Sequence, residues 1–116
     1  MTAPAFRPAP RTIGVKLTTT NQTTVYTAAG ANVIEVVEWV HIGNTDSTPR
    51  TVTLEWTDDS AATTYALMTA QVVPANASIR LELGVMFPPG DALKATASSA
   101  NTLQVVVAVC EMGRSS

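Results

Sequence analysis

The sequence predicts an all-β fold: an antiparallel, jelly-roll-like β-sandwich of about eight strands that follows an extended N-terminal arm. Apolar and polar residues alternate with a period of two in several short runs, as they do in strands. Turn-forming Gly, Pro, Asn and Asp residues separate these runs at intervals of roughly 8–12 residues, which is typical of sandwiches and jelly rolls. Hydrophobic residues make up 46% of the chain but aromatic residues only 5%, so we expect a mainly aliphatic core.

The first eleven residues differ in composition from the rest. They contain three prolines and two arginines: Pro4, Pro8, Pro10, Arg7 and Arg11. Because proline lacks an N–H and fixes φ, this composition disfavours helices and strand pairing and suits an extended arm. We therefore predict an arm over residues 1–11 and a sandwich domain over residues 12–116. Two interpretations of the arm stay open: a disordered leader, or a tether that crosses a neighbouring subunit with Phe6 as its apolar anchor.

Two short expected strands precede the longest apolar stretch. Residues 12–20 place three aliphatic side chains on one face, and residues 23–27 form a second run. A turn of small residues at 28–32 then leads into residues 33–42, both faces of which are largely apolar. A sheet with one solvated face would not require this. The second face is therefore covered either within the subunit or by a second subunit.

The second half of the chain repeats the same pattern. The turn-rich segment G-N-T-D-S-T-P at 43–49 leads into a strand at 51–57, which has one apolar and one polar face. A loop at 58–62 follows. The remaining expected strands are residues 63–69, for which a helix is the alternative, 79–83, 85–87, 93–97 and 103–109. The last strand, continued to residue 112, is also apolar on both faces and is a second candidate for burial between subunits.

Charge and composition exclude several classes of function. Only 14% of the residues are charged, against roughly 25% in a typical soluble domain, which indicates that partners cover much of the surface. The seven basic residues are spread thinly and the net charge is −2, so we expect no nucleic-acid partner. No apolar run approaches the roughly 20 residues of a membrane span, and the N-terminus lacks the apolar core of a signal peptide.

Residues that could carry chemistry are few and scattered. His41 is the only histidine, so neither a His-rich metal site nor a Ser-His-Asp arrangement can be assembled from several candidates. Glu35 and Glu38 are three apart on an expected strand and so face opposite sides. The lone Cys110 is expected to pack as a small core hydrophobe, and Asp91 to cap its own turn. We expect no enzymatic activity, no cofactor and no metal.

Four stretches, residues 25–37, 42–54, 67–83 and 88–112, resemble a β-sandwich module of tailed-phage virions. The shared features are a Tyr-Thr strand that enters a Gly turn and an N-T-x-S turn before a Thr/Val strand. They also include a Pro-Ala-x-x-S approach to a Leu strand, and a Gly-Asp-x-Leu turn before the last hairpin. Such modules serve as head decoration or cement proteins and as fibre or tail-tip domains, commonly as homotrimers. The chain has no repetitive shaft, so it fits the decoration or cement type better than a fibre tip.

The resemblance implies a structural virion protein that decorates or cements the capsid surface as a homo-oligomer, with a trimer expected. Its partners would be itself and the major capsid protein or another virion protein, and it would be made in the host cytoplasm and carried on the virion. We predict two sets of contact residues: Val33, Val37, Trp39 and His41 for packing between subunits, and Phe6, Arg7 and Arg11 for docking to the capsid.

Two alternatives come from other classes. A tail- or fibre-associated receptor or carbohydrate-binding module would use the loops at 43–49 and 57–62, and tryptophan or tyrosine rings could stack on sugars. Trp56, however, shares a face with Val52 and Leu54, so we expect it in the core. A degenerate cupin-like or hydrolase enzyme would need a metal or a nucleophile and base, and the sequence supplies neither.

Overall fold

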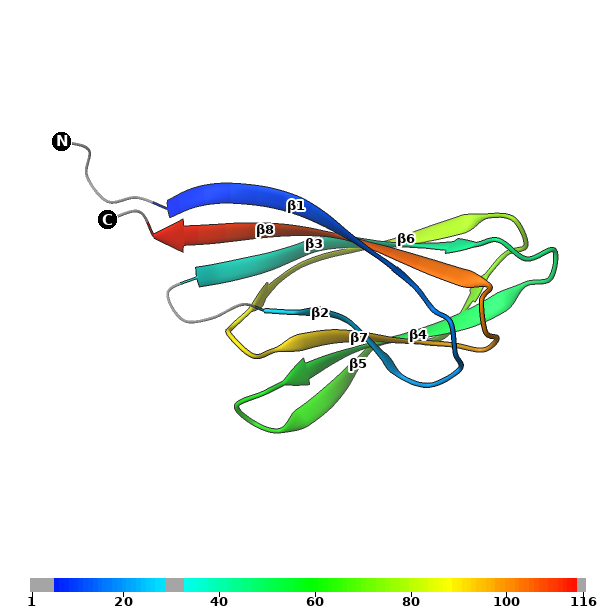
Figure 1. Ribbon diagram of the computed structural model, residues 1–116. Coiled ribbons are helices and arrows are strands. Elements are labelled where there is room, and N and C mark those ends of the chain that lie inside the picture. Colours follow the sequence, from blue (N-terminus) through cyan, green and yellow to red (C-terminus); the bar gives the residue numbers. More distant parts are fainter. Residues whose placement is uncertain (1–5, 29–32, 115–116) are drawn as a thin grey trace.

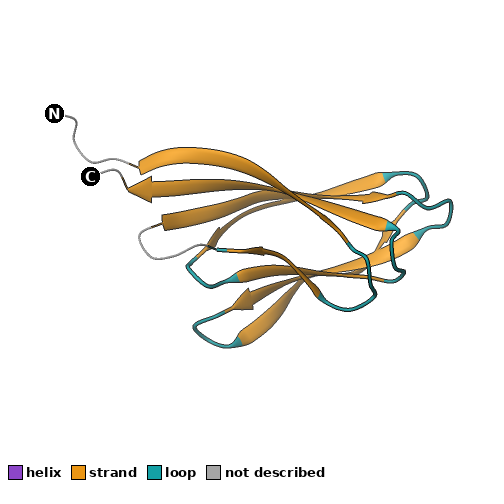
Figure 2. Cartoon of the chain, viewed as in Figure 1, coloured by secondary structure: helices purple, strands orange, loops and turns teal. Residues whose placement is uncertain are grey.

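The computed structural model describes residues 6–28 and 33–114, with the backbone alone at residues 6–9, 33–34 and 112–114 (Figure 1). Every regular element in these ranges is a strand (Figure 2). The eight strands are β1 (Phe6–Lys16), β2 (Thr23–Thr27), β3 (Val33–Asn44), β4 (Arg50–Asp58), β5 (Thr63–Val73), β6 (Ser78–Phe87), β7 (Ala92–Ala97) and β8 (Leu103–Arg114).

The strands form two four-stranded antiparallel sheets that face each other. Sheet A has the order β1-β8-β3-β6 and sheet B the order β2-β7-β4-β5. Apart from β4 and β5, which form a hairpin within sheet B, successive strands lie in opposite sheets, so that the chain passes repeatedly between the layers (Figure 1). This connectivity is that of a jelly roll. The predicted fold class, an all-β jelly-roll-like sandwich, is confirmed.

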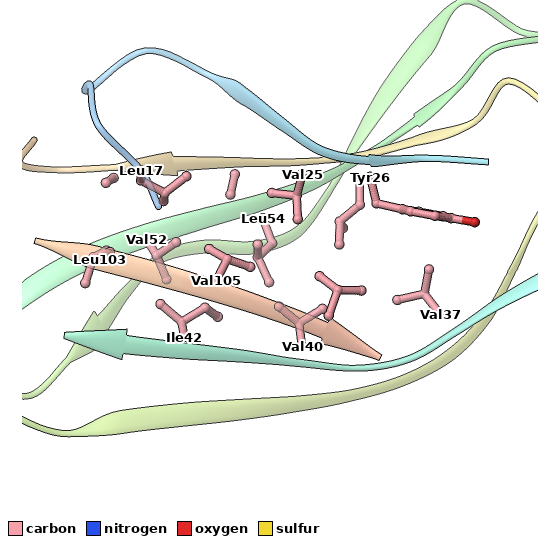
Figure 3. Packing of buried hydrophobic residues seen from close by; sticks show 14 of the residues in the cluster. Leu17, Val25, Tyr26, Val37, Val40, Ile42, Val52, Leu54, Leu103 and Val105 are labelled. Carbon is pink, nitrogen blue, oxygen red and sulfur yellow. The ribbon is translucent and has the colours of Figure 1, made fainter. Parts of the chain in front are cut away.

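The core is a layer of aliphatic side chains between the two sheets. Period-two alternation points every second residue inward, and the inward residues of the central strands are almost completely buried. Figure 3 shows part of this layer, including Val40 and Ile42 of β3, Val105 of β8, and Val52 and Leu54 of β4. Burying each such side chain stabilises the fold by roughly 1.5–3 kcal/mol. The described chain therefore folds around a mainly aliphatic core, and its single cysteine is free.

Two expected strands, 79–83 and 85–87, are one continuous strand, β6. Gly84 has a φ of 62°, and the β3–β6 register shifts between the pairs Trp39↔Glu82 and Val37↔Val85. Two residues of β6 therefore face one residue of β3, which is a β-bulge with glycine in the left-handed conformation. The strand bends there but does not end. The segment at 63–69 is a strand, as predicted, and extends to Val73.

The predicted boundary between arm and sandwich is corrected. Strand β1 begins at Phe6 and pairs with β8 from Phe6↔Arg114 to Lys16↔Gln104, so residues 6–11 belong to sheet A; residues 1–5 lie outside the described residues. Strand β1 lies at the edge of the sheet, with β8 as its neighbour. Pro8 and Pro10 are two residues apart, so their backbone nitrogens point to the same side of β1. When that side is the free edge, the missing N–H groups cost no hydrogen bond to β8.

Candidate interaction surface

The outward side of sheet A is mostly apolar at its centre. The outward residues of β3 and β8 lie directly opposite one another in the pairs Val36↔Cys110, Trp39↔Ala108 and His41↔Val106. All six side chains are partly buried although no other strand of the described chain lies on this side. We call this set of six residues the outer surface of sheet A. The stretches 33–42 and 103–112 were each expected to be apolar on both faces, and the structure places them side by side as β3 and β8.

The flanking strands extend this surface differently on its two sides. On β1, Thr12 lies opposite Ala108 and Gly14 opposite Val106, so small side chains continue the outer surface. On β6, Arg80 lies opposite His41 and Glu82 opposite Trp39. At the level of these pairs, charged groups therefore border the apolar centre on the β6 side and small residues border it on the β1 side.

A shallow groove of about 730 Å³ crosses the β3–β6 border. It is lined by Val36, Glu38, Trp39, Arg80, Glu82, Leu83, Gly84 and Cys110. The Arg80 guanidinium carbon lies 4.5 Å from the centre of the Trp39 ring, and Arg80 Nε lies 2.8 Å from Glu82 Oε1. The cation thus covers the indole face and also pairs with a carboxylate. An apolar floor with charges of both signs is suited to protein contacts.

A second β-bulge, on β3 itself, changes which residues share a face of this strand: between the pairs Val37↔Val109 and Trp39↔Ala108, β3 has the extra residue Glu38. Val37 points into the core and is fully buried, whereas Trp39 lies on the outer surface, because the register shifts between them at Glu38. The sequence pattern places these residues on one face, and the bulge separates them. Val37 is therefore not accessible to a second subunit. Of the predicted packing residues, Trp39 and His41 lie together on the outer surface of sheet A. The Val33 side chain is not among the described residues.

The predicted docking residues also divide. Phe6 and Arg7 belong to β1, but the structure describes only their backbone. Arg11 turns inward: its Nη2 lies 3.6 Å from Glu35 Oε1 and 3.7 Å from Glu111 Oε2. Its guanidinium is also 5.6 Å from the Tyr26 ring centre. The Arg11 charge is therefore engaged within the chain.

The outward side of sheet B is polar by contrast. Glu55 of β4 lies opposite Lys94 of β7, and Gln22 Nε2 donates to Glu55 Oε1 at 2.7 Å. Threonines alternate around this pair, for example Thr53 opposite Thr96. The two sheets thus present chemically different outer sides, one apolar and one hydroxyl-rich.

The loop at 43–49 is held by its own polar groups. Asn44 Nδ2 donates to the carbonyls of Thr48 and Val73 at 2.9 and 3.1 Å. Arg50 Nε donates to Asp46 Oδ2 at 2.8 Å, and this hydrogen bond from Arg50 is the main cause that lowers the pKa of Asp46 below its ordinary value. These polar groups fix the loop rather than leaving it open for a ligand.

Asp91 fixes the other loop of the alternative recognition surface. Trp56 Nε1 donates to Asp91 Oδ2 at 2.8 Å, and the Asp59 amide donates to Oδ1 at 3.0 Å. The carboxylate therefore joins β4 to the loop at 58–62. The sequence had predicted instead that Asp91 caps its own turn. Trp56 packs against the core, as expected, and stacks on Tyr65 with ring centres 5.2 Å apart.

Three further features bear on chemistry. Cys110, expected in the core, is a partly buried residue of the outer surface of sheet A, because its neighbour Val109 takes the inward position. Within residues 6–28 and 33–114, no three His, Cys, Asp or Glu side chains are grouped so as to hold a metal ion. The same ranges contain no helix of the length and hydrophobicity that crossing a membrane requires.

No protein-family model and no curated protein matches the sequence. Solved structures do match the fold. The endospore appendages of Bacillus, which form disulfide-linked pili, align with a TM-score of 0.57 and 12% identity over 97% of this chain and 91% of that chain. The capsid of Helicobacter pylori bacteriophage KHP30 aligns with a TM-score of 0.54 and 11% identity over 95% and 91%. The core of Drosophila NLP, a pentamer-forming and histone-binding protein, aligns with 0.54 and 9% over 90% and 98%.

These similarities establish the fold. The chain is a jelly-roll β-sandwich of the kind shared by capsid and pilus structural proteins. Sequence identity at this level does not carry any one of their functions over to this chain.

Proposed function

We propose that this chain is a structural virion protein of a tailed phage, which decorates or cements the capsid surface as a homotrimer. The observation that carries the proposal is the outer surface of sheet A. Two central strands present Trp39, His41, Val106, Ala108 and other partly buried side chains outward, although the core lies on the opposite side. The proposal assigns no catalytic activity to the chain.

Affinity would come from apolar burial and from multivalency. Apolar surface removed from water contributes roughly 25 cal/mol per Å², and the small residues on β1 allow a second chain to approach the outer surface closely. An oligomer that docks through several equivalent contacts binds far more tightly than one subunit does. The jelly-roll fold, shared with the KHP30 capsid structure, and the turn resemblance to virion modules both support this role.

The test combines oligomeric state with capsid binding. We expect light scattering to detect an oligomer and the protein to co-sediment with emptied capsids of the phage that encodes it. Ala108→Glu, which places a charge at the centre of the outer surface of sheet A, should dissociate the oligomer and lower capsid occupancy. Thr53→Glu, on the polar outward side of sheet B, is the matched control and should change neither. A monomeric wild-type protein that does not bind capsids would overturn the proposal.

A tail- or fibre-associated carbohydrate-binding module is the second candidate, and one observation favours it. Tyr65 is 47% exposed and stacks on Trp56 beside the loop at 58–62, and exposed aromatic faces bind sugar rings. In that case a glycan array would show binding that Tyr65→Ala abolishes, and emptied capsids would not retain the protein. Capsid binding that is unaffected by Tyr65→Ala would argue for the first candidate.

A further inference from the structure

Strand β6 is an edge of sheet A. It pairs with β3 on one side, and no other strand of the described chain pairs with it. An edge strand exposes a row of backbone N–H and C=O groups that can pair with another chain. Its inward side chains pack against the core but are only partly buried: Ile79, Leu81, Leu83 and Val85. The edge therefore leaves both hydrogen-bonding capacity and apolar surface unused.

The sequence of β6 is complementary to itself. Residues 79–83 read Ile-Arg-Leu-Glu-Leu, so the apolar positions are symmetric about Leu81 and the two charges are opposite in sign. In an antiparallel pair of identical strands centred on Leu81, Arg80 of each copy lies opposite Glu82 of the other. Residues directly opposite share a face. Such a pair gains two ion pairs and places Ile79 opposite Leu83 on the inward face.

The backbone limits pairing to this same segment. Strand β6 begins at Ser78, and its bulge lies at Gly84, where φ is 62°. Seven residues lie between and including these two, and Leu81 is the middle one. A centre at Leu81 therefore uses the whole straight part of the edge. A centre displaced by one residue would place Arg80 opposite Arg80 or Glu82 opposite Glu82, so that like charges face each other. A centre displaced by two residues would carry the pairing into the bulge or beyond the start of the strand at Ser78.

The charged side chains are available for this exchange. The Arg80 side chain is 50% exposed and the Glu82 side chain 71% exposed, and they pair with each other within the strand at 2.8 Å. Exposed pairs within one strand contribute little to stability. Each residue can therefore turn to the opposite charge of a second copy while Arg80 still lies against Trp39.

We propose that β6 pairs with β6 of a second copy around a two-fold axis at Leu81 and joins the two copies of sheet A into one continuous sheet. The occupant of this edge is a second copy because the charges and the straight segment are self-complementary about one residue. The contact rests on the proposed self-association but not on capsid binding. It uses the edge and leaves the outer surface of sheet A free, so it would link chains of neighbouring trimers.

Charge reversal tests the contact. Arg80→Glu should raise the dissociation constant of the two-fold contact about tenfold or more, because like charges then lie opposite each other, and should lower the mass measured by light scattering to that of the unlinked trimer. Glu82→Arg should do the same. The double swap, and a mixture of the two single variants, should restore the wild-type mass, since both recreate opposite charges. An oligomer whose mass neither single reversal changes would overturn this proposal while leaving self-association intact.

A cysteine scan tests the register independently of charge. In a Cys110→Ser background, Leu81→Cys places the new thiol on the axis next to its own counterpart, so mild oxidation should yield covalent dimers. Ile79→Cys is the matched control, because its counterpart lies four residues away along the strands, about 13 Å, beyond disulfide reach. Equal cross-linking at both positions, or none at Leu81→Cys in a folded variant, would refute the register. If these tests detect no pairing between β6 strands but the protein still binds capsids, only the proposed edge contact is overturned.

Discussion

Arg11 on β1 approaches the fully buried carboxylate of Glu35 on β3 although β8 separates the two strands. Its Nη2 lies 3.6 Å from Glu35 Oε1 and 3.7 Å from Glu111 Oε2 of the intervening strand. Glu35 is 0% exposed, whereas the Arg11 side chain is 47% exposed. The guanidinium thus connects three neighbouring strands at one end of sheet A and supplies a positive charge to a carboxylate that water does not reach.

Removing this guanidinium should destabilise the fold. Breaking a buried ion pair by deleting one partner costs about 3–5 kcal/mol, and because Arg11 is half exposed we expect Arg11→Met to cost about 2 kcal/mol. Urea unfolding followed by tryptophan fluorescence measures the change. Lys16→Met, on the same strand, is the control and should cost less than about 0.5 kcal/mol. In a Glu35→Gln background the effect of Arg11→Met should shrink; an unchanged effect there would contradict the assigned role.

Asp91 should be essential for joining β4 to the loop at 58–62. It is 2% exposed and accepts hydrogen bonds from Trp56 Nε1 and the Asp59 amide. Asp91→Ala leaves both donors without this acceptor, which should cost about 3 kcal/mol. Asp91→Asn retains one acceptor oxygen and should cost about half as much. Thermal unfolding by circular dichroism compares them, and equal losses for the two variants would mean that shape rather than hydrogen bonding matters at this position.

The fold class could be predicted from the sequence because period-two alternation and turn residues are local signals. The strand at 23–27 and the apolar character of β3 and β8 followed from them. The position of β1 could not be read in the same way. Pro8 and Pro10 indicate an arm when considered locally, and only the place of β1 at a sheet edge makes strand pairing compatible with prolines. Sheet order is nonlocal and has no signal in one sequence.

The candidate surface was predicted in part. Apolar residues on both faces of 33–42 indicated an outward contact, and Trp39 and His41 lie there. Val37 was misassigned because a β-bulge at Glu38 reverses the alternation, and a single inserted residue is invisible to a period-two pattern. The inward turn of Arg11 was not predicted because its partner Glu35 lies on a strand that is distant in sequence. Glu35 is one of two carboxylates on the mainly apolar strand β3, and that was the available signal.

Val37 and His41, four residues apart on β3, should respond differently when their side chains are replaced by alanine. Val37→Ala opens a cavity in the core and should cost about 2 kcal/mol of unfolding free energy. His41→Ala, on the outer surface of sheet A, should change monomer stability by no more than about 0.5 kcal/mol while weakening self-association. Unfolding at low protein concentration and light scattering at high concentration separate the two effects. Loss of stability in His41→Ala with association unchanged would contradict this assignment.

Two glycines with positive φ should tolerate alanine unequally. Gly90 has a φ of 92°, and a Cβ there would lie 2.7 Å from Asp59 Oδ2, so Gly90→Ala combines backbone strain with a steric clash. We expect a cost of about 2–3 kcal/mol. Gly84 has a φ of 62° with nothing within 4 Å of the added Cβ, so Gly84→Ala should cost only about 1 kcal/mol. Melting temperatures that rank the two variants in the reverse order would show that the clash is relieved elsewhere.

Acid should remove the stabilising effect of Asp46. The hydrogen bond from Arg50 lowers the pKa of this carboxyl below its ordinary value of 3.8. A carboxyl whose pKa is lower in the folded state stabilises the fold fully above its unfolded-state pKa, and this contribution is lost as the pH falls through the folded-state pKa. Asp46→Asn should therefore have a lower melting temperature than wild type at about pH 7, and the two melting temperatures should converge as the pH falls through the folded-state pKa. Because the pair lies at the surface, added salt should also narrow the gap at neutral pH. A difference that persists unchanged at low pH would assign the effect of Asp46→Asn to its backbone turn rather than to the ion pair with Arg50.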